Sequence, residues 1–328
     1  MIASGQDITG AVSGRKLLIG VIRNRVLFLF ILIVLLSLFA SIAYDTFFTS
    51  ENLKAVILNI SIDAIVSVGM MILLTSGVFD LTVGSVLGFA GAITALCLDK
   101  LHLHPGFAAL IGILSAGCIG AFNGVIVAKI GVNHLIMGLA MLGVVRGVVL
   151  LLIGSGIHRL PEEFLLISKA SFLGLGLPVW YMIVIAAFFA LLLRKTKLFR
   201  RYYYIGGNEK AASFSGIDVI KMRIISFMIS SGLAGISGVV LTAKLAASIP
   251  TLGMGLELRS ITACILGGAS LSGGYGTIIG SILGVLFMGL VNNLMIVSRV
   301  VIAWQSIVIS GILLVAVTID AFLKKSER

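Results

Sequence analysis

The chain alternates between long apolar stretches and short polar segments. A helix needs about 20 apolar residues to cross the hydrocarbon core of a bilayer, and ten stretches approach that length. The pattern predicts membrane spans at residues 26–44, 56–76, 84–98, 106–128, 135–153, 178–193, 223–243, 260–271, 275–296 and 302–322. The third and eighth are short for a full crossing, so we expect either of them to be broken or re-entrant.

The composition indicates a membrane protein. Of the 328 residues, 59% are hydrophobic and 11% are charged, whereas a soluble domain has about a quarter of its residues charged. This leaves too little polar surface to cover a water-exposed globule, so the remaining apolar surface must face lipid. We therefore predict an all-α polytopic membrane protein with one integral domain at 26–322 and short tails at 1–25 and 323–328.

Basic residues gather in three segments that a ten-span topology places on one side of the membrane. The positive-inside rule assigns that side to the cytoplasm, which predicts a bacterial inner-membrane protein with both termini inside. These residues are Arg15, Lys16, Arg23 and Arg25, then Arg194, Lys195, Lys197, Arg200, Arg201, Lys210, Lys221 and Arg223, and finally Lys324, Lys325 and Arg328. Because they flank the spans, the net charge of +11 reports topology and does not indicate nucleic-acid binding.

The motifs of common enzymes are missing from the sequence. There is no G-x-x-x-x-G-K-[ST] phosphate loop, no H-E-x-x-H metal motif and no recognisable hydrolase triad. The three cysteines lie in apolar spans without metal-ligand spacing, so we interpret them as small packing residues. We expect no metal or cofactor on this chain and no enzymatic activity of its own.

Two parts of the chain resemble each other. Asn123 and Asn292 each follow a glycine by three residues, Gly120 and Gly289, near the end of a glycine-spaced helix. Five spans in each half, at 26–153 and 178–322, would set the two copies in opposite orientations, as in many transporters. The alternative is that glycine-rich apolar helices look alike by composition.

Polar residues within the spans are few. A charge inside the bilayer costs from about 2.5 kcal/mol upward, so such groups turn toward protein or a water-filled cavity. Asn59, Asp63 and Ser67 follow one another at helical spacing and form a polar stripe on one face. The stripe lines a hydrophilic path, or else Asp63 or Asp80 forms a buried ion pair with Arg146.

The segment 79–85, Phe-Asp-Leu-Thr-Val-Gly-Ser, interrupts the apolar pattern where the third span begins. Asp80 or Thr82 can cap a helix here, or the segment is a broken helix beside a pore. Asn123, Asn292 and Asn293 carry amides that suit a neutral polyol. These amides also suit hydrogen bonds between helices, and we favour that second role.

A short helix is predicted in the basic segment, at 206–216. Asn208 is a suitable N-cap, Glu209 complements the helix dipole and Gly216 can end the helix in left-handed geometry. A helix this short is marginal alone in water, so we expect it to dock into a partner's groove, with Phe214 exposed. The alternative is an ordinary solvent loop.

Three segments together resemble a known family. The segments 79–85, 205–217 and 265–277 are similar to those of the ribose/xylose/arabinose class of ABC importer permeases, and the resemblance runs from about residue 50 to the end. It implies the helical fold of importers of the vitamin B12 type. It also implies two permease copies, as a homodimer or heterodimer, with ATPase subunits that hold ATP and Mg²⁺, and a periplasmic solute-binding protein.

Two sets of candidate functional residues follow. The first set would couple the chain to the ATPase: Gly206, Gly207, Asn208, Glu209, Ala211, Ala212, Phe214 and Gly216. The second set would lie along the translocation path: Asn59, Asp63, Asp80, Ser85, Asn123, Gly267, Ser270, Asn292 and Asn293. The resemblance implies the coupling helix and places Asp80, Ser85 and the segment 267–276 near the translocation path. The other members of the second set are included because they are polar residues within the predicted spans.

Family resemblance does not fix the solute. Ribose, other pentoses, hexoses, furanose sugars and the autoinducer-2 signal are carried by members of this class, and we expect alternating access driven by the ATPase. The competing hypothesis is a secondary transporter driven by H⁺ or Na⁺ through Asp63 and Asp80, which would work without an ATPase.

Overall fold

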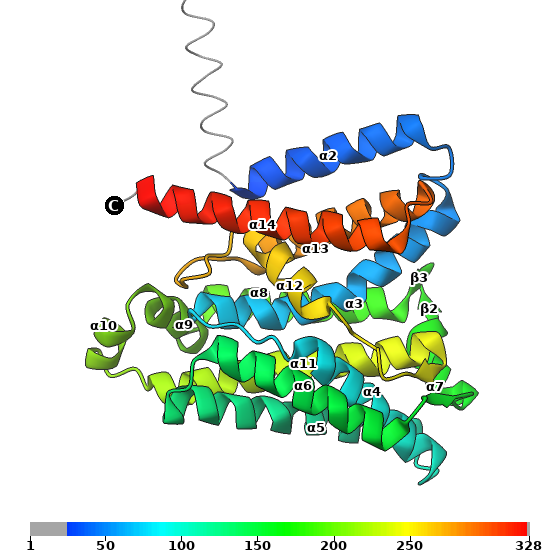
Figure 1. Ribbon diagram of the computed structural model, residues 1–328, viewed down its shortest axis with the longest axis horizontal. Helices are drawn as coiled ribbons and strands as arrows, with labels where there is room; N and C mark the ends of the chain where they lie inside the picture. The colour runs from blue at the N-terminus through cyan, green and yellow to red at the C-terminus, as the bar shows by residue number, and fades with distance from the viewer. Residues whose placement is uncertain (1–24, 327–328) are drawn as a thin grey trace, which may run out of the picture.

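The computed structural model describes residues 25–326 as a bundle of helices that run side by side between two ends (Figure 1). Among the described residues, seven helices are long and apolar enough to cross a membrane. They are α2 (Arg25–Ala43), α3 (Ser50–Thr75), α5 (Pro105–Val125) with its π-helical continuation η1 (Ile126–Ile130), α6 (His134–Ile153), α8 (Leu177–Lys195), α11 (Val219–Leu245) and α13 (Ile278–Val297).

Helices also occupy the other three predicted spans. These are α4 (Val83–Asp99), α12 (Leu256–Leu266) and α14 (Ile302–Ser326). α4 has 17 residues and α12 has 11, so the expectation that the third and eighth spans are short is confirmed. Each of these two helices follows a non-helical segment, at 76–82 before α4 and at 249–255 before α12.

The two ends of the bundle carry different elements. At one end, called here the α10 end, lie the start of α2, the end of α14 and the helices α9 (Lys197–Gly207) and α10 (Glu209–Phe214) (Figure 1). At the opposite end, called the α7 end, lie α7 (Glu162–Lys169) and the strands β2 (Ser171–Phe172) and β3 (Leu175–Gly176), which pair antiparallel. A second antiparallel pair joins β1 (Ile157–His158) to β4 (Ala247–Ser248).

Part of the predicted basic distribution can be placed. The basic segment 194–223 includes α9 and α10 and so lies at the α10 end, together with the start of α2 and the end of α14. The predicted basic residues Arg15, Lys16, Arg23 and Arg328 lie outside the described residues.

The centre of the bundle is formed by α3 and α11. In the most apolar stretch of each helix, 78% of the residues of α3 and 61% of those of α11 are buried, against 17% for α2 and for α8. The two central helices contact each other, and between them they also contact α4, α5, α8, α12 and α13. The exposed apolar faces of the outer helices are the surface that lipid would cover.

Small residues let the helices approach one another closely. A β-carbon at Gly69 of α3 would lie 2.7 Å from the Cα atom of Ser230 in α11, and one at Gly238 of α11 would overlap the carbonyl of Leu87 in α4. Close approach through small residues is typical of helix packing in membranes. Two of the cysteines are buried, as expected of packing residues, whereas Cys118 is exposed.

Candidate functional site

The predicted short helix is present as α10. Asn208 is its N-cap, and its Oδ1 accepts a hydrogen bond from the amide of Ala211 at 3.0 Å. At the other end the amide of Ile217 donates to the carbonyl of Ala212 at 3.1 Å, and Gly216 has φ +80°. The N-cap and the left-handed glycine are therefore confirmed, because both depend only on local backbone chemistry.

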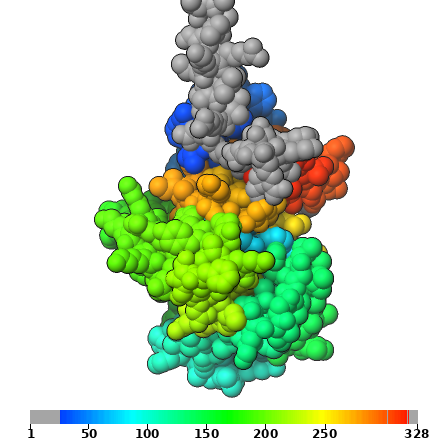
Figure 2. Space-filling model, turned by 90° about the vertical axis from the view of Figure 1, so that its left-hand side faces the viewer, coloured from blue at the N-terminus to red at the C-terminus, as the bar shows by residue number. Residues whose placement is uncertain are grey.

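α10 attaches to the bundle by a small part of its surface. Ala212 is 4% exposed and faces inward, whereas Phe214 is 90% exposed. Figure 2 looks at the α10 end and shows the α9–α10 segment in the middle of that face, with no other described element over it. The outward side of α10 is thus accessible to another molecule, and the predicted exposure of Phe214 is confirmed.

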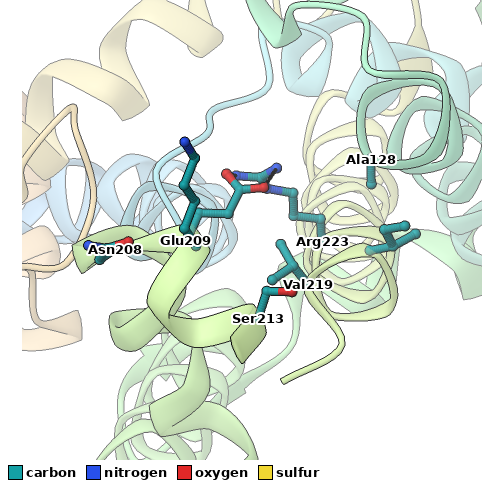
Figure 3. Close-up of a pocket in the computed structure, with 8 residues that line it drawn as sticks. Ala128, Asn208, Glu209, Ser213, Val219 and Arg223 are labelled. Carbon is teal, nitrogen blue, oxygen red and sulfur yellow. Dashed lines mark hydrogen bonds and ion pairs between the residues drawn. The ribbon is translucent and has the colours of Figure 1, made fainter. Parts of the chain in front are cut away.

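An ion pair fixes α10 to the first turns of α11. Arg223 donates from Nη1 to Glu209 Oε1 at 2.9 Å and from Nη2 to Oε2 at 2.6 Å (Figure 3). The Arg223 side chain is 17% exposed and that of Glu209 is 51% exposed. A two-bond arginine–carboxylate pair fixes geometry as well as distance, so α10 and α11 are held in one orientation. The sequence analysis missed this contact.

Two cavities flank α10. One, of about 510 Å³, lies between α10, the start of α11 and η1, and the Glu209–Arg223 pair forms part of its wall (Figure 3). The other, of about 850 Å³, lies between α9 and α10, and Lys197, Arg200 and Arg201 contribute to its lining. α10 therefore stands between two hollows, one of which carries three basic side chains.

Asp80 and Asn123 meet in the interior through Thr82. Asp80 Oδ1 accepts hydrogen bonds from the amide of Thr82 at 2.8 Å and from its hydroxyl at 2.7 Å. Asn123 Nδ2 donates to the same hydroxyl at 3.1 Å, and Ser85 donates to the Thr82 carbonyl at 2.8 Å. All four residues are buried, so this network fixes the non-helical segment 76–82 against α4 and α5.

The predicted stripe on α3 faces α11 and α12. Asn59 accepts a hydrogen bond from Lys244 of α11, and Asp63 pairs with Arg259 of α12 at 3.7 Å. Ser67 is buried, and its carbonyl accepts a weak hydrogen bond from Cys264 of α12 at 3.4 Å. Asn59 and Asp63 thus have charged, partly exposed partners, whereas Ser67, one turn further along α3, is buried.

The alternative of an ion pair between Arg146 and Asp63 or Asp80 is wrong. Arg146 Nη1 donates instead to the carbonyls of Pro250 and Leu252, at 2.7 Å each. The reason is positional: α12 begins at Leu256, four residues earlier than predicted, and brings Arg259 to Asp63. Arg146 on α6 meets the non-helical segment before α12, whose carbonyls lack helical partners.

The remaining asparagines have different surroundings. Asn293 of α13 and Asn52 of α3 exchange two amide hydrogen bonds, at 3.0 Å and 2.7 Å. The preferred role of Asn293 as a link between helices is confirmed, and this pairing leaves its amide little capacity for a solute. Asn292 is half-buried, and its predicted place on the path stays a prediction.

The coupling segment and the segment 265–277 meet at the α10 end. Gly267 caps α12 and packs against Gly280 of α13, and Ser270 is buried in the loop that follows. Further along that loop, Gly273 lies against Gly206 of α9 and against Gly77, which comes shortly before the segment 79–85. The structure thus joins segments that the sequence assigned to two different roles, coupling and translocation.

Comparison with known proteins identifies the family. The profile described as "Branched-chain amino acid transport system / permease component" matches residues 52–317. The chain belongs to this permease family. The match covers most of the chain, including all three motif segments, and confirms that the chain is a permease component of a transport system. No solved structure matches the chain.

Named relatives cover nearly the whole chain. The L-arabinose ABC transporter permease protein AraH of Azospirillum brasilense is 36% identical over 91% of this chain and 88% of its own length. The ribose import permease protein RbsC of Escherichia coli (strain K12) is 35% identical over 95% of this chain and 98% of its own length. The D-allose transport system permease protein AlsC of the same organism is 32% identical over 90% of this chain and 91% of its own length. The resemblance to sugar importer permeases is confirmed.

Proposed function

We propose that this chain is the transmembrane permease subunit of an ATP-driven importer for a sugar such as ribose or a related pentose or hexose. The observation that carries the proposal is α10, a capped and outward-facing helix fixed to the transmembrane helix α11 by Arg223 and Glu209. The family description names branched-chain amino acids. The relatives that match over most of this length are named for arabinose, allose and ribose, and they favour a sugar.

The proposed mechanism is alternating access driven from outside the chain. Partner ATPase subunits hold ATP and Mg²⁺, receive α10 in a groove and move it when they close. A periplasmic solute-binding protein delivers the sugar to the opposite side of a pair of permease copies. The exposed outer side of α10 supports this role, because the Phe214 side chain is 90% exposed in this chain and offers an apolar surface that a partner's groove could cover.

We further propose ten membrane crossings arranged as two inverted repeats of five, at 26–153 and 178–322, in a fold of the vitamin B12 importer type. In each half, a non-helical segment leads into a short helix, α4 or α12, and a glycine-rich helix, α5 or α13, packs against it. α5 runs toward the α10 end and α13 runs away from it (Figure 1). This opposite direction supports inversion, and the basic residues at 194–223 support a cytoplasmic α10 end in the inner membrane.

The alternative, an ion-coupled secondary transporter, needs titratable carboxylates that can bind an ion. Asp63 is paired with Arg259, and Asp80 accepts two hydrogen bonds from Thr82. Asp63 therefore has an ionic partner, whereas the buried Oδ2 of Asp80 has no hydrogen-bond partner among the described residues. The relatives, named as permeases of an ABC transporter and of import systems, make the importer the better explanation.

A reconstitution experiment tests the proposal. Proteoliposomes that contain this chain with its ATPase and its binding protein should accumulate radiolabelled ribose or a related sugar only when ATP is supplied. Proteoliposomes with the chain alone and an imposed H⁺ or Na⁺ gradient should not. Uptake by the chain alone, driven by an ion gradient, would refute the ATP-driven assignment.

A further inference from the structure

Three glycines from distant parts of the chain meet backbone to backbone at the α10 end. Gly206 lies near the end of α9, Gly77 follows α3, and Gly273 lies in the loop between α12 and α13. We call this set the glycine junction. A β-carbon at Gly273 would lie 2.7 Å from the Cα atom of Gly206 and 2.7 Å from that of Gly77.

The contacts of Gly206 leave no room for a side chain. A β-carbon at this position would overlap the carbonyl oxygen of Thr75 and the amide nitrogen of Gly274, and would lie 2.9 Å from the Cα atom of Gly273. All of these are backbone atoms, so no side-chain rotation can relieve the overlap. Adding one methyl group therefore forces α9 away from α3 and from the loop after α12.

Two hydrogen bonds reinforce the glycine junction. The amide of Gly274 donates to the carbonyl of Thr75, the last residue of α3, at 3.0 Å. The phenol of Tyr203 in α9 donates to the carbonyl of Gly276, just before α13, at 2.8 Å. A phenol keeps its proton at neutral pH, and burial raises the pKa of Tyr203 further, so Tyr203 remains a donor.

The place of the junction in the chain gives it mechanical importance. α9 leads through Asn208 directly into α10. On the other side of the junction stand α3, the most buried of the seven long apolar helices in the described chain, and α12, the short helix that follows a non-helical segment. Backbone contacts have no rotamers that could absorb a displacement, and packed protein transmits strain.

We propose that the glycine junction is the contact through which a movement of α10 reaches α3 and α12, and that Gly206 and Tyr203 are positioning residues for transport. This inference rests on the proposed function. It adds a second route from α10 into the membrane, separate from the Glu209–Arg223 pair, which leads to α11.

The test compares ATP hydrolysis with transport in the complete complex of this chain, its ATPase and its binding protein, in lipid nanodiscs and proteoliposomes. For the assembled Gly206→Ala complex, the basal rate of ATP hydrolysis by the ATPase is measured first and is the reference for that complex. Its stimulation by the sugar-loaded binding protein, and the uptake of sugar, should fall about tenfold or more, as expected when a packed contact is forced apart. Gly117→Ala is the matched control, because a methyl group on this α5 glycine would contact nothing within 4 Å.

A milder variant keeps the inference testable if Gly206→Ala does not assemble. Tyr203→Phe removes one hydrogen bond and adds no atoms, and it should lower sugar-stimulated hydrolysis about fivefold, the effect of one lost bond. An assembled Gly206→Ala complex that keeps the wild-type ratio of stimulated to basal hydrolysis would overturn the role of the junction. If Gly206→Ala does not assemble, the same result in Tyr203→Phe would overturn it. Either outcome rejects only the role of the junction and leaves the proposed function standing. Lack of ATP-dependent uptake by the wild-type complex would instead reject the proposed function, and the junction's role with it.

Discussion

Arg223 and Glu209 connect α10 to α11 through two parallel hydrogen bonds. Arg223→Leu should weaken this connection by about 1 kcal/mol, since Glu209 is half-exposed and water screens the pair. We expect sugar uptake to fall severalfold while membrane insertion is unchanged. The double variant with the two charges exchanged, Glu209→Arg with Arg223→Glu, should recover part of the uptake.

The control for this prediction is Lys221→Gln, which removes a positive charge from the same end of α11. It separates the loss of the pair from a general loss of charge. Equal uptake in Arg223→Leu and Lys221→Gln would contradict a specific role for the pair.

The amide exchange between Asn52 and Asn293 is a second residue-scale feature with a measurable effect. Asn293→Ala removes two hydrogen bonds between α3 and α13, and such bonds are worth about 0.6 to 2 kcal/mol in membranes. We expect a lower thermal unfolding temperature in detergent. The control is Asn292→Ala, at the half-buried neighbouring position, which should lower that temperature less. An equal decrease in both variants would show that the amide pair is not the cause.

Residue contacts could be predicted from the sequence where they are local. The Asn208 cap and the left-handed Gly216 depend on residues at most a few positions apart. The pairing of Asp63 with Arg259 depends instead on how neighbouring helices are rotated and where they begin. A single sequence does not contain that information, which explains why Arg146 was assigned the wrong partner.

At the scale of elements, α10 is the part whose loss should abolish transport. Deletion of 208–216, or Ala212→Pro, should remove ATPase association while the protein still inserts in the membrane. Ala212 is suitable because its amide donates to the carbonyl of Asn208 at 2.9 Å, a bond that proline cannot make. A pull-down in detergent measures association, and undiminished recovery of the ATPase would contradict the docking role.

The long helices were predictable because apolar stretches of membrane length leave few alternatives. Each predicted span coincides with a helix, and the two short ones were recognised by length. Helix starts were less predictable: α3 begins six residues before the predicted span and α11 four residues before it. In both, the helix begins at a local N-cap, Thr49 or Asp218, and continues through polar residues that an apolar window excludes.

At the scale of the whole molecule, the two ends of the bundle should face opposite compartments. Ser213 at the α10 end and Phe172 at the α7 end are both exposed. In a cysteine-free background, Ser213→Cys should react with a membrane-impermeant maleimide in inside-out vesicles only, and Phe172→Cys in right-side-out vesicles only. Labelling of Ser213→Cys from the periplasm would rule out an ATPase acting on α10.

The glycine junction shows what the sequence could not provide at this scale. Gly206 and Gly273 each belong to a motif that could be recognised from the sequence, and Gly77 comes just before a third, but their meeting depends on the complete bundle. The family could be recognised from the motifs, and the comparisons confirm it. The connection between the coupling and translocation segments required the three-dimensional arrangement.

The shortness of α12 has a consequence for the tightness of the membrane seal. Eleven residues of helix rise about 17 Å, which is little more than half of the roughly 30 Å hydrocarbon core. In the proposed ten-crossing topology, the chain before α12 stands at depth without a helix's own bonds, and Arg146 takes the place of solvent by donating to two of its carbonyls. Without that guanidinium, water would have to enter the bundle to satisfy the same two oxygens.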